Sequence, residues 1–334
     1  MAATPTSKLT AKPTPDNPAQ LALATLFATL PDALWGVAYS GGADSTALLL
    51  AAAKKWPGQV HAIHIHHGLQ AAADDFALVC KSVCNAHGLP LHVVHVSAVP
   101  ARGESPEDAA RKARYGALVA SATQLGLYGV LLGQHADDQV ETLLLALSRG
   151  AGLPGLSGMS AQFQRSGMTF YRPLLQTPAS GLRDWLMQCN IPFVDDPTNT
   201  DERYTRNRIR ARLLPALADS FPQFRETFAR SARHAAQAHS LLVEMASDDL
   251  ARTGTEPAIE VLQTLSGARQ ANLLRHWLLQ THHATASTAQ LAQLLVQIAA
   301  CKTRGHQIHL KVATGHVTRS GAVLRYTPAV AQSG

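Results

Sequence analysis

The sequence lacks the features of several large classes of protein. It contains no apolar run of about 18 residues, the length that a membrane-spanning helix needs. Its four cysteines form no CxxC pair, so we expect no disulfide framework and a reducing, cytoplasmic compartment. Aromatic residues make up only 5%, too few for an extended surface on which bases stack.

What the sequence does contain is an ordinary globular composition with an excess of basic residues. Hydrophobic residues account for 46% and charged residues for 16%. The formal net charge of +6 favours a polyanionic partner, because Lys and Arg side chains displace the counterions of phosphates. A mildly basic enzyme without such a partner has the same composition, so the charge alone leaves both alternatives open.

The 334 residues suffice for two domains. Residues 1–19 have no apolar segment and no arginine, so they are expected to form a disordered tail, not a signal or transit peptide. Strand-like and helix-like patterns then alternate, which predicts an α/β domain with a doubly wound, Rossmann-like parallel sheet over 20–214. A helical connector is expected over 215–250 and a small C-terminal α+β domain over 251–334.

The expected elements of the first domain are short and closely spaced. Strands are predicted at 34–39, 59–66, 91–96 and 128–133, and a hairpin near 163–171. Helices are predicted near 19–30, 44–55, 72–87 and 105–126, and from 137 onward. The last domain is expected to have helices near 260–280 and 287–299, followed by three strands. Ligands of doubly wound sheets lie beyond the carboxyl ends of the strands, so residues after each strand are candidate site residues.

A glycine-containing loop follows the first predicted strand and precedes its helix. Glycines let the backbone approach an anion, and the helix N-terminus offers free N–H groups and partial positive charge. Asp44 would repel phosphates unless a cation intervenes, and Mg²⁺ is the natural one. No lysine follows the glycines, so the loop is not a Walker A motif. The sequence therefore predicts a phosphate-binding loop made of Ser40, Gly41, Gly42, Ala43, Asp44 and Ser45. The alternative is a plain turn followed by a helix cap.

Two further groups of residues follow later strands or lie on the helices between them. Arg111, Arg114 and Tyr115 share a helix face, which is either a binding surface or a solvated basic face. Asp137, Asp138 and Glu141 can converge on one patch and hold Mg²⁺ or an ammonium group. Acids in a first helical turn also stabilise the helix dipole, which is the alternative for these three.

Histidines cluster at the end of the second predicted strand. They stand at positions 61, 64, 66 and 67. A zinc site would need further ligands at motif spacing, and none is near. We therefore expect these histidines to serve another purpose than metal binding.

The order of these strings resembles the PP-loop ATP pyrophosphatase family and, within it, the lysidine synthetases. The shared strings are Ser40–Ser45, 64–69, 110–115, 133–142, 148–156, 172–175, 194–199 and 206–210. The resemblance runs from about residue 20 to 330, and it implies that the small C-terminal domain, 251–334, binds tRNA. It does not include the second C-terminal domain of the longer lysidine synthetases, which leaves the recognition of the acceptor end of the tRNA open.

The resemblance implies roles for individual residues. ATP binding is implied for Ser40, Gly41, Gly42, Ala43, Asp44, Ser45, His66 and His67. Catalysis is implied for Asp44, Arg111, Arg114, Asp137, Asp138 and Glu141. Mg²⁺ binding is implied for Asp44 and Asp137, lysine binding for Asp138 and Glu141, and substrate or tRNA contact for Arg206, Asn207 and Arg210.

The resemblance also implies a reaction. AMP is transferred from ATP to the oxygen on carbon 2 of the wobble cytidine of a tRNA(Ile) with a CAU anticodon, and pyrophosphate leaves. The ε-amine of L-lysine then displaces AMP.

Three other functions are weighed against this one. A PP-loop tRNA thiolase needs a cysteine sulfur or an iron–sulfur cluster, and no cysteine cluster lies near the loop. Small-molecule amidotransferase synthetases carry a glutaminase region, for which no nucleophile motif is found. A nucleotide- or RNA-binding adaptor would bind ATP without releasing pyrophosphate.

Overall fold

The computed structural model describes residues 15–66, 72–97, 105–195, 201–303 and 305–328. The chain divides into two compact units, Met1–Arg233 and His234–Gly334. The boundary falls inside the long helix α10 (Phe224–Thr253), within the range expected for the connector. Among the described residues, no helix is both long and apolar enough to cross a membrane.

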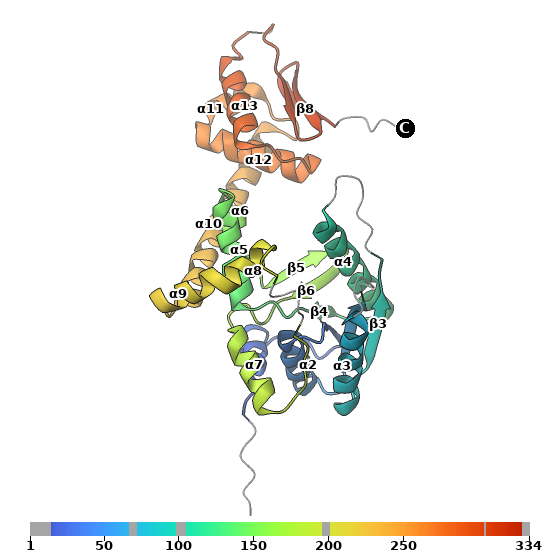
Figure 1. Ribbon diagram of the computed structural model, residues 1–334. Coiled ribbons are helices and arrows are strands. Elements are labelled where there is room, and N and C mark those ends of the chain that lie inside the picture. The colour runs from blue at the N-terminus through green and yellow to red at the C-terminus, as the bar shows by residue number, and fades with distance from the viewer. Residues whose placement is uncertain (1–14, 67–71, 98–104, 196–200, 304, 329–334) are drawn as a thin grey trace, which may run out of the picture. The chain divides into compact units, whose positions relative to one another are not determined.

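The first unit is built on a six-stranded sheet with the order β3-β2-β1-β4-β6-β5 (Figure 1). The strands are β1 (Trp35–Ala38), β2 (Val60–His66), β3 (Leu91–His95), β4 (Gly129–Leu131), β5 (Gln162–Arg165) and β6 (Met168–Tyr171). All neighbours pair in parallel except β5 and β6, which are antiparallel. The chain winds outward from β1 in one direction and then from β4 in the other, which confirms the doubly wound class. The hairpin was expected, but not its place at the edge of this sheet.

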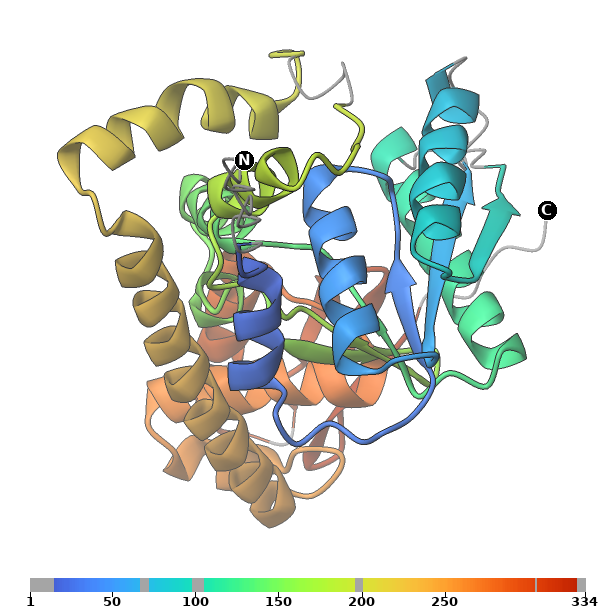
Figure 2. The same ribbon diagram turned by 90° about the horizontal axis from the view of Figure 1, so that it is seen from below.

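Helices cover both faces of the sheet. The helices of the first unit are α1 (Pro18–Leu26), α2 (Ala43–Lys55), α3 (Ala72–Ala86), α4 (Pro106–Gln124), α5 (Ala136–Ser148), α6 (Leu153–Leu156), α7 (Ala179–Gln188), α8 (Thr205–Arg208), the π-helix η2 (Ile209–Leu213), α9 (Leu214–Ser220) and the first part of α10. Helices α1, α2 and α7 contact one another (Figures 1 and 2) and share a hydrophobic core with α3. Helix α4 packs in a second core, on the opposite face.

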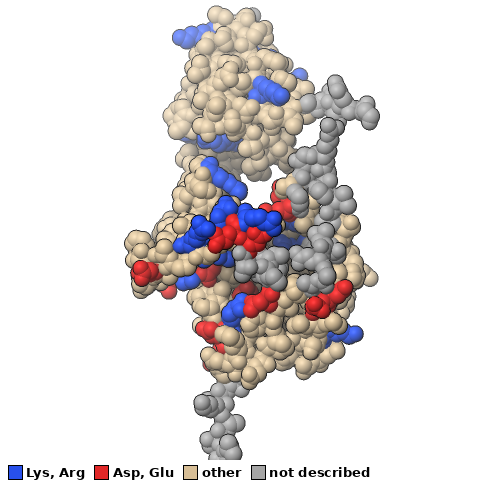
Figure 3. Space-filling view, viewed as in Figure 1, with Lys and Arg blue, Asp and Glu red and all other residues tan. Residues whose placement is uncertain are grey.

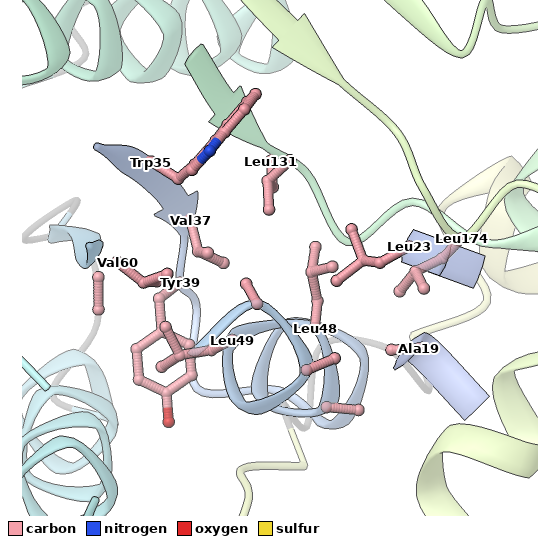
Figure 4. Close-up of a cluster of buried hydrophobic side chains, with 14 of the residues drawn as sticks. Ala19, Leu23, Trp35, Val37, Tyr39, Leu48, Leu49, Val60, Leu131 and Leu174 are labelled. Atoms are coloured by element: carbon pink, nitrogen blue, oxygen red, sulfur yellow. The ribbon is translucent and has the colours of Figure 1, made fainter. Parts of the chain in front are cut away.

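The alternation of side chains along β1 explains why both faces are buried. Trp35, Val37 and Tyr39 point into the core that contains Leu48 and Leu49 of α2 (Figure 4). The residues between them face the α4 side, because successive side chains of a strand point to opposite faces. Burial on both faces is typical of a central parallel strand.

The first helix begins earlier than expected. Asn17 is 2% exposed, and its side chain accepts a hydrogen bond from the Ala19 N–H at 2.9 Å and donates one to the Ala47 carbonyl at 2.8 Å. This N-cap fixes the start of α1 at Pro18, where proline is well tolerated. The packed chain therefore includes the end of the range expected to be a tail.

The second unit is a small α+β domain, as expected. Helices α11 (Ile259–Thr264), α12 (Gly267–His282) and α13 (Thr288–Ala300) pack on a three-stranded antiparallel sheet of β7 (His309–Val312), β8 (Gly315–Ser320) and β9 (Val323–Thr327). Trp277 is fully buried in its core, and the indole N–H donates to the Thr255 carbonyl at 2.9 Å.

Candidate active site

The loop between β1 and α2 has the geometry of an anion site. Gly41 has φ +85°, a conformation that side chains disfavour, and a Cβ there would lie 3.0 Å from the Cys80 sulfur. Ser45 Oγ lies 3.0 Å from Ser40 Oγ and donates to the Gly42 carbonyl at 3.1 Å, which closes the turn. The Val194 N–H donates to the Gly41 carbonyl at 2.8 Å and holds the loop from outside. The first N–H groups of α2 have no intrahelical partner and are available to a phosphate.

A cavity of about 660 Å³ lies at the carboxyl ends of β1, β2 and β4, in front of this loop. Its volume suits a nucleotide-sized ligand. The sequence-predicted site residues that line it are Ser40, Gly42, Asp44, Ser45, His66, Arg114, Asp138 and Arg210. The predicted residues that are described but do not line it are Gly41, Ala43, Arg111, Asp137, Glu141, Arg206 and Asn207. His67 and most of the 194–199 string lie outside the described residues.

Two carboxylates face one imidazole on the cavity wall. Nε2 of His135 lies 3.6 Å from Asp44 Oδ2 and 3.5 Å from Asp138 Oδ2. Nδ1 of the same ring accepts the Asp138 N–H at 3.4 Å as the N-cap of α5, so the ring proton belongs on Nε2, toward the carboxylates. His135 stands inside a string that the sequence analysis quoted, but no role was assigned to it. Its position just before Asp137 and Asp138 could have indicated a role beside these carboxylates.

The environment of Asp44 favours a bound cation. Burial raises the pKa of the Asp44 carboxyl, the nearby Asp138 raises it further, and His135 opposes this shift. A divalent cation would relieve the burial of charge and the repulsion between the two carboxylates. The described residues contain no group of three protein ligands for a metal, so such an ion would also need phosphate oxygens, as Mg²⁺ commonly does.

Asp137 points away from the cavity. Its Oδ2 accepts the Ala179 N–H at 3.1 Å, and its Oδ1 accepts Nε of Arg225 at 2.7 Å. These contacts lower the pKa of Asp137 against the effect of burial, which alone would raise it. Asp137 therefore ties α5 to α7 and α10, and this geometry does not favour the expected role in Mg²⁺ binding; Asp138 takes the position beside Asp44.

Glu141 is enclosed by arginines. Its side chain has no exposed surface; it is paired with Nε of Arg210, and Nη1 of Arg206 lies 3.4 Å away. Nη2 of Arg210 also donates to Asp138 at 2.9 Å. Burial raises the pKa of Glu141, and Arg210 opposes that shift. Charged side chains of both signs gather over the region of α8 in Figure 3. The residues expected to bind lysine are thus in contact with those expected to bind tRNA.

Asn207 of α8 is buried against the residues just before that helix. It is 8% exposed, and its amide donates to the Asp201 carbonyl at 2.9 Å. This contact favours a role in shaping the α8 turn over the expected contact with substrate.

Arg111 and Arg114 lie on one side of α4, as their spacing predicts. Their guanidinium carbons are 5.8 and 5.6 Å from the centre of the Tyr115 ring, which is 2% exposed. Within the described residues neither arginine forms an ion pair, and burial lowers the pKa of Arg114. Of the two, only Arg114 reaches the cavity.

The three described histidines at the end of β2 have partners other than a metal. His61 contacts His92, and Nδ1 of His64 lies 2.9 Å from the Tyr39 carbonyl. Nε2 of His66 lies 3.1 Å from Asp74. Nδ1 of His66 is buried without a partner among the described residues, and His66 lines the cavity.

Comparisons with known families agree with this architecture. The PP-loop domain family matches residues 15–217, and the TilS substrate binding domain family matches residues 258–326. In solved structures, the fold is similar to the U34-tRNA thiolase NcsA from Methanococcus maripaludis, with a TM-score of 0.55 and 13% identity over 65% of this chain and 77% of that one. An identity this low shows a shared fold only.

Curated relatives are much more similar. The chain is 69% identical to the tRNA(Ile)-lysidine synthase of Polaromonas naphthalenivorans over 95% of this chain and 97% of the relative. It is 39% identical to that of Bordetella pertussis, over 82% and 89% of the two chains. With that of Burkholderia mallei it shares 41% identity over 84% of this chain but 59% of the longer relative. The chain therefore belongs to the tRNA(Ile)-lysidine synthase family of PP-loop proteins.

Proposed function

We propose that the chain is an ATP-dependent ligase that joins L-lysine to carbon 2 of the wobble cytidine of a tRNA(Ile) with a CAU anticodon. AMP is first transferred to the oxygen on carbon 2, with release of pyrophosphate, and the lysine amine then expels AMP. The observation that carries the proposal is the convergence of the phosphate loop, Asp44, Asp138 and Arg114 on one cavity, in a chain 69% identical to a tRNA(Ile)-lysidine synthase.

The loop and the cavity supply the nucleotide site. The N–H groups at the start of α2 hold the two outer phosphates of ATP as they leave together. His66 lines the same cavity and is assigned to the rest of the nucleotide. Arg114 adds a positive charge to the cavity lining, where it would stabilise the charge that develops at the reacting phosphate.

Asp44 and Asp138 would hold Mg²⁺. Both carboxylates line the cavity, and both lie within 3.6 Å of Nε2 of His135. When bound, Mg²⁺ would neutralise charge on the phosphates. The role of His135 is to keep the two carboxylates in place.

For the second step, after pyrophosphate has left, we assign Asp138 to the lysine amine. It faces the cavity, whereas Glu141 is enclosed by Arg206 and Arg210. Contact between Glu141 and lysine would require Arg210 to move. We therefore assign to Glu141 the positioning of Arg210, whose guanidinium also contacts Asp138.

The C-terminal part of the second unit is rich in basic residues, two of which, Arg269 and Arg325, pair with Asp249 and Glu256 of the same unit. Residues 261–334 contain no Asp or Glu, but seven Arg or Lys and six His. Such a segment attracts the phosphates of tRNA, and its affinity is expected to fall with salt. This pattern and the match to the TilS substrate binding domain support tRNA as the substrate.

The protonation of the buried cysteines does not favour a tRNA thiolase. Burial raises the pKa of Cys80 to about 12 and that of Cys84 to about 11. Sulfur transfer needs a thiolate, so these buried thiols are poorly suited to it.

The cytoplasmic location expected from the sequence stays a prediction.

The substrate is tested by product analysis. The protein is incubated with ATP, labelled lysine and a tRNA(Ile) transcript with a CAU anticodon, and the RNA is digested to nucleosides. We expect label in one modified cytidine, and none with an elongator or initiator tRNA(Met). Equal labelling of tRNA(Met), or a sulfur-containing nucleoside, would contradict the proposed function.

A further inference from the structure

A cluster of arginines surrounds three aromatic rings beside the cavity. Tyr115 of α4, Phe163 of β5 and Phe170 of β6 form the aromatic part, with Phe170 5.2 Å from each of the other two rings. Four arginines lie around it: Arg111, Arg114, Arg165 and Arg172. We call this group the arginine cluster. Because it joins α4 to the β5–β6 hairpin, it has a fixed framework.

The guanidinium groups lie close to the rings. The guanidinium carbon of Arg165 is 4.6 Å from the centre of the Tyr115 ring, and that of Arg172 is 4.1 Å from the centre of Phe163. Contacts between cations and ring faces are favourable but weak. They offset only part of the mutual repulsion of four positive charges.

Arg172 is the most buried member. It is 6% exposed, its Nε donates to Gln134 Oε1 at 2.9 Å, and its Nη1 donates to the Ser160 carbonyl at 2.8 Å. Both acceptors are neutral. Burial lowers the pKa of Arg172, the Tyr115 hydroxyl opposes this shift, and Arg111 lowers the pKa further. A buried cation without a counter-charge costs stability, which an anion at this position would recover.

No carboxylate neutralises the cluster. Within the described part of the chain, none of its four arginines forms an ion pair. The nearest acids in sequence, Glu107 and Asp108, lie in the first turn of α4, where Asp108 accepts a hydrogen bond from Ser105 at 2.9 Å. The cluster therefore presents uncompensated positive charge to an incoming anion.

The position of the cluster indicates the source of that anion. Only Arg114 lines the cavity, whereas Arg165 is on β5, the edge strand of the sheet. The phosphate loop follows β1, and β4 and β6 lie between β1 and β5. The outer phosphates of an ATP molecule on the loop are thus separated from Arg165 by two strands, whereas an RNA strand carries a phosphate at every nucleotide.

We propose that Arg111, Arg165 and Arg172 bind one phosphodiester of the tRNA strand that carries the reactive cytidine, while Arg114 faces the reaction in the cavity. The planar guanidinium groups suit phosphate oxygens. This assignment rests on the proposed function and adds a substrate-binding site on the β5–β6 hairpin.

The test compares Arg165→Gln with Lys54→Gln. Both changes remove one positive charge, but Lys54 is an exposed residue in the last turn of α2, the end opposite the loop. The dissociation constant of the tRNA(Ile) transcript is measured without ATP or lysine at several salt concentrations. For Arg165→Gln we expect weaker binding by about tenfold. We also expect log affinity to depend less steeply on log salt concentration, with the magnitude of the negative slope reduced by about 0.7. Lys54→Gln should leave both unchanged, and Arg165→Lys should recover part of the affinity.

Two results would overturn the proposed phosphodiester site on the arginine cluster. One is unchanged affinity and slope in Arg165→Gln. The other is a raised KM for ATP with unchanged tRNA binding, which would assign the cluster to the nucleotide. The proposed function is tested separately, because a wild-type chain that binds the transcript through Arg165 but forms no lysidine would refute the function and leave the phosphate site standing.

Discussion

At the scale of single residues, the candidate site contains a carboxylate whose charge the fold disfavours. Asp44 is in the first turn of α2, where the helix dipole favours an acid, yet burial and Asp138 raise its pKa. Residues that lower stability are commonly retained where they serve function. Asp44 is therefore the residue at which activity and stability should change in opposite directions.

We expect Asp44→Asn to lower the rate of lysine-dependent AMP formation by at least about 100-fold, because a ligand for the cation is lost. Without nucleotide, the same variant should have a higher free energy of unfolding at pH 7. The pKa of Asp44 is higher in the folded than in the unfolded chain, so its charge lowers stability as pH rises from about 4 through the folded pKa. Urea unfolding at pH 4 and pH 7 checks this, and an Asn variant less stable than the wild type at pH 7 would contradict it.

The sequence predicted many of the residues that line the cavity, because the strings that begin at Ser40, His64 and Gly133 lie at the carboxyl ends of β1, β2 and β4. The resemblance implied that Asp137 binds Mg²⁺, whereas Asp138 is the residue of the pair that lines the cavity. Adjacent residues on a helix point about 100° apart, so only one of the two faces the cavity, and the rotation of α5 decides which. The role of His135 was missed because it depends on the ring orientation set by the N-cap.

At the scale of elements, the segment α8–η2 shapes the acidic side of the cavity. It brings Arg206 and Arg210 to Glu141, which lies 65 and 69 residues away in the chain. The π-helix places Arg210 where it contacts both Glu141 and Asp138, and π-helical turns are frequent at functional sites.

We expect Arg210→Ala to lower the free energy of unfolding by about 3 kcal/mol, because it removes the main partner of a buried carboxylate. Urea unfolding measures this. The matched control is Arg212→Ala, which breaks the exposed pair with Glu202 and should cost less than about 1 kcal/mol. Adding Glu141→Gln to Arg210→Ala should recover part of the loss. If Arg210→Ala and Arg212→Ala lowered the free energy of unfolding equally, a structural role for the Arg210–Glu141 pair would be refuted.

Most elements were predicted from local patterns, and the exceptions have a physical reason. The alternation of apolar strands and amphipathic helices gave β1 to β4 and α2 to α5. The place of β5 at the sheet edge depends on β6 pairing with β4, a contact between distant segments that local pattern does not contain. The contact of Arg210 in η2 with Glu141 likewise joins distant segments.

At the scale of the whole molecule, charge and chemistry divide between the two units. The cavity and its acids belong to the first unit, whereas residues 261–334 of the second are without acids. Composition predicted a polyanionic partner only as one of two alternatives, because the net charge of the chain averages over these segments. The fold class followed from the order of elements, while the pairing of arginines with the carboxylates did not.

The central claim is that ATP is split between its α- and β-phosphates as lysine is joined to tRNA. The most direct measurement follows ATP labelled in the α- or γ-phosphate, with the tRNA(Ile) transcript and lysine, and separates the products. The account predicts one AMP and one pyrophosphate for each lysine incorporated, and no AMP when lysine or the transcript is left out. Formation of ADP and orthophosphate, or lysine incorporation without pyrophosphate, would contradict it.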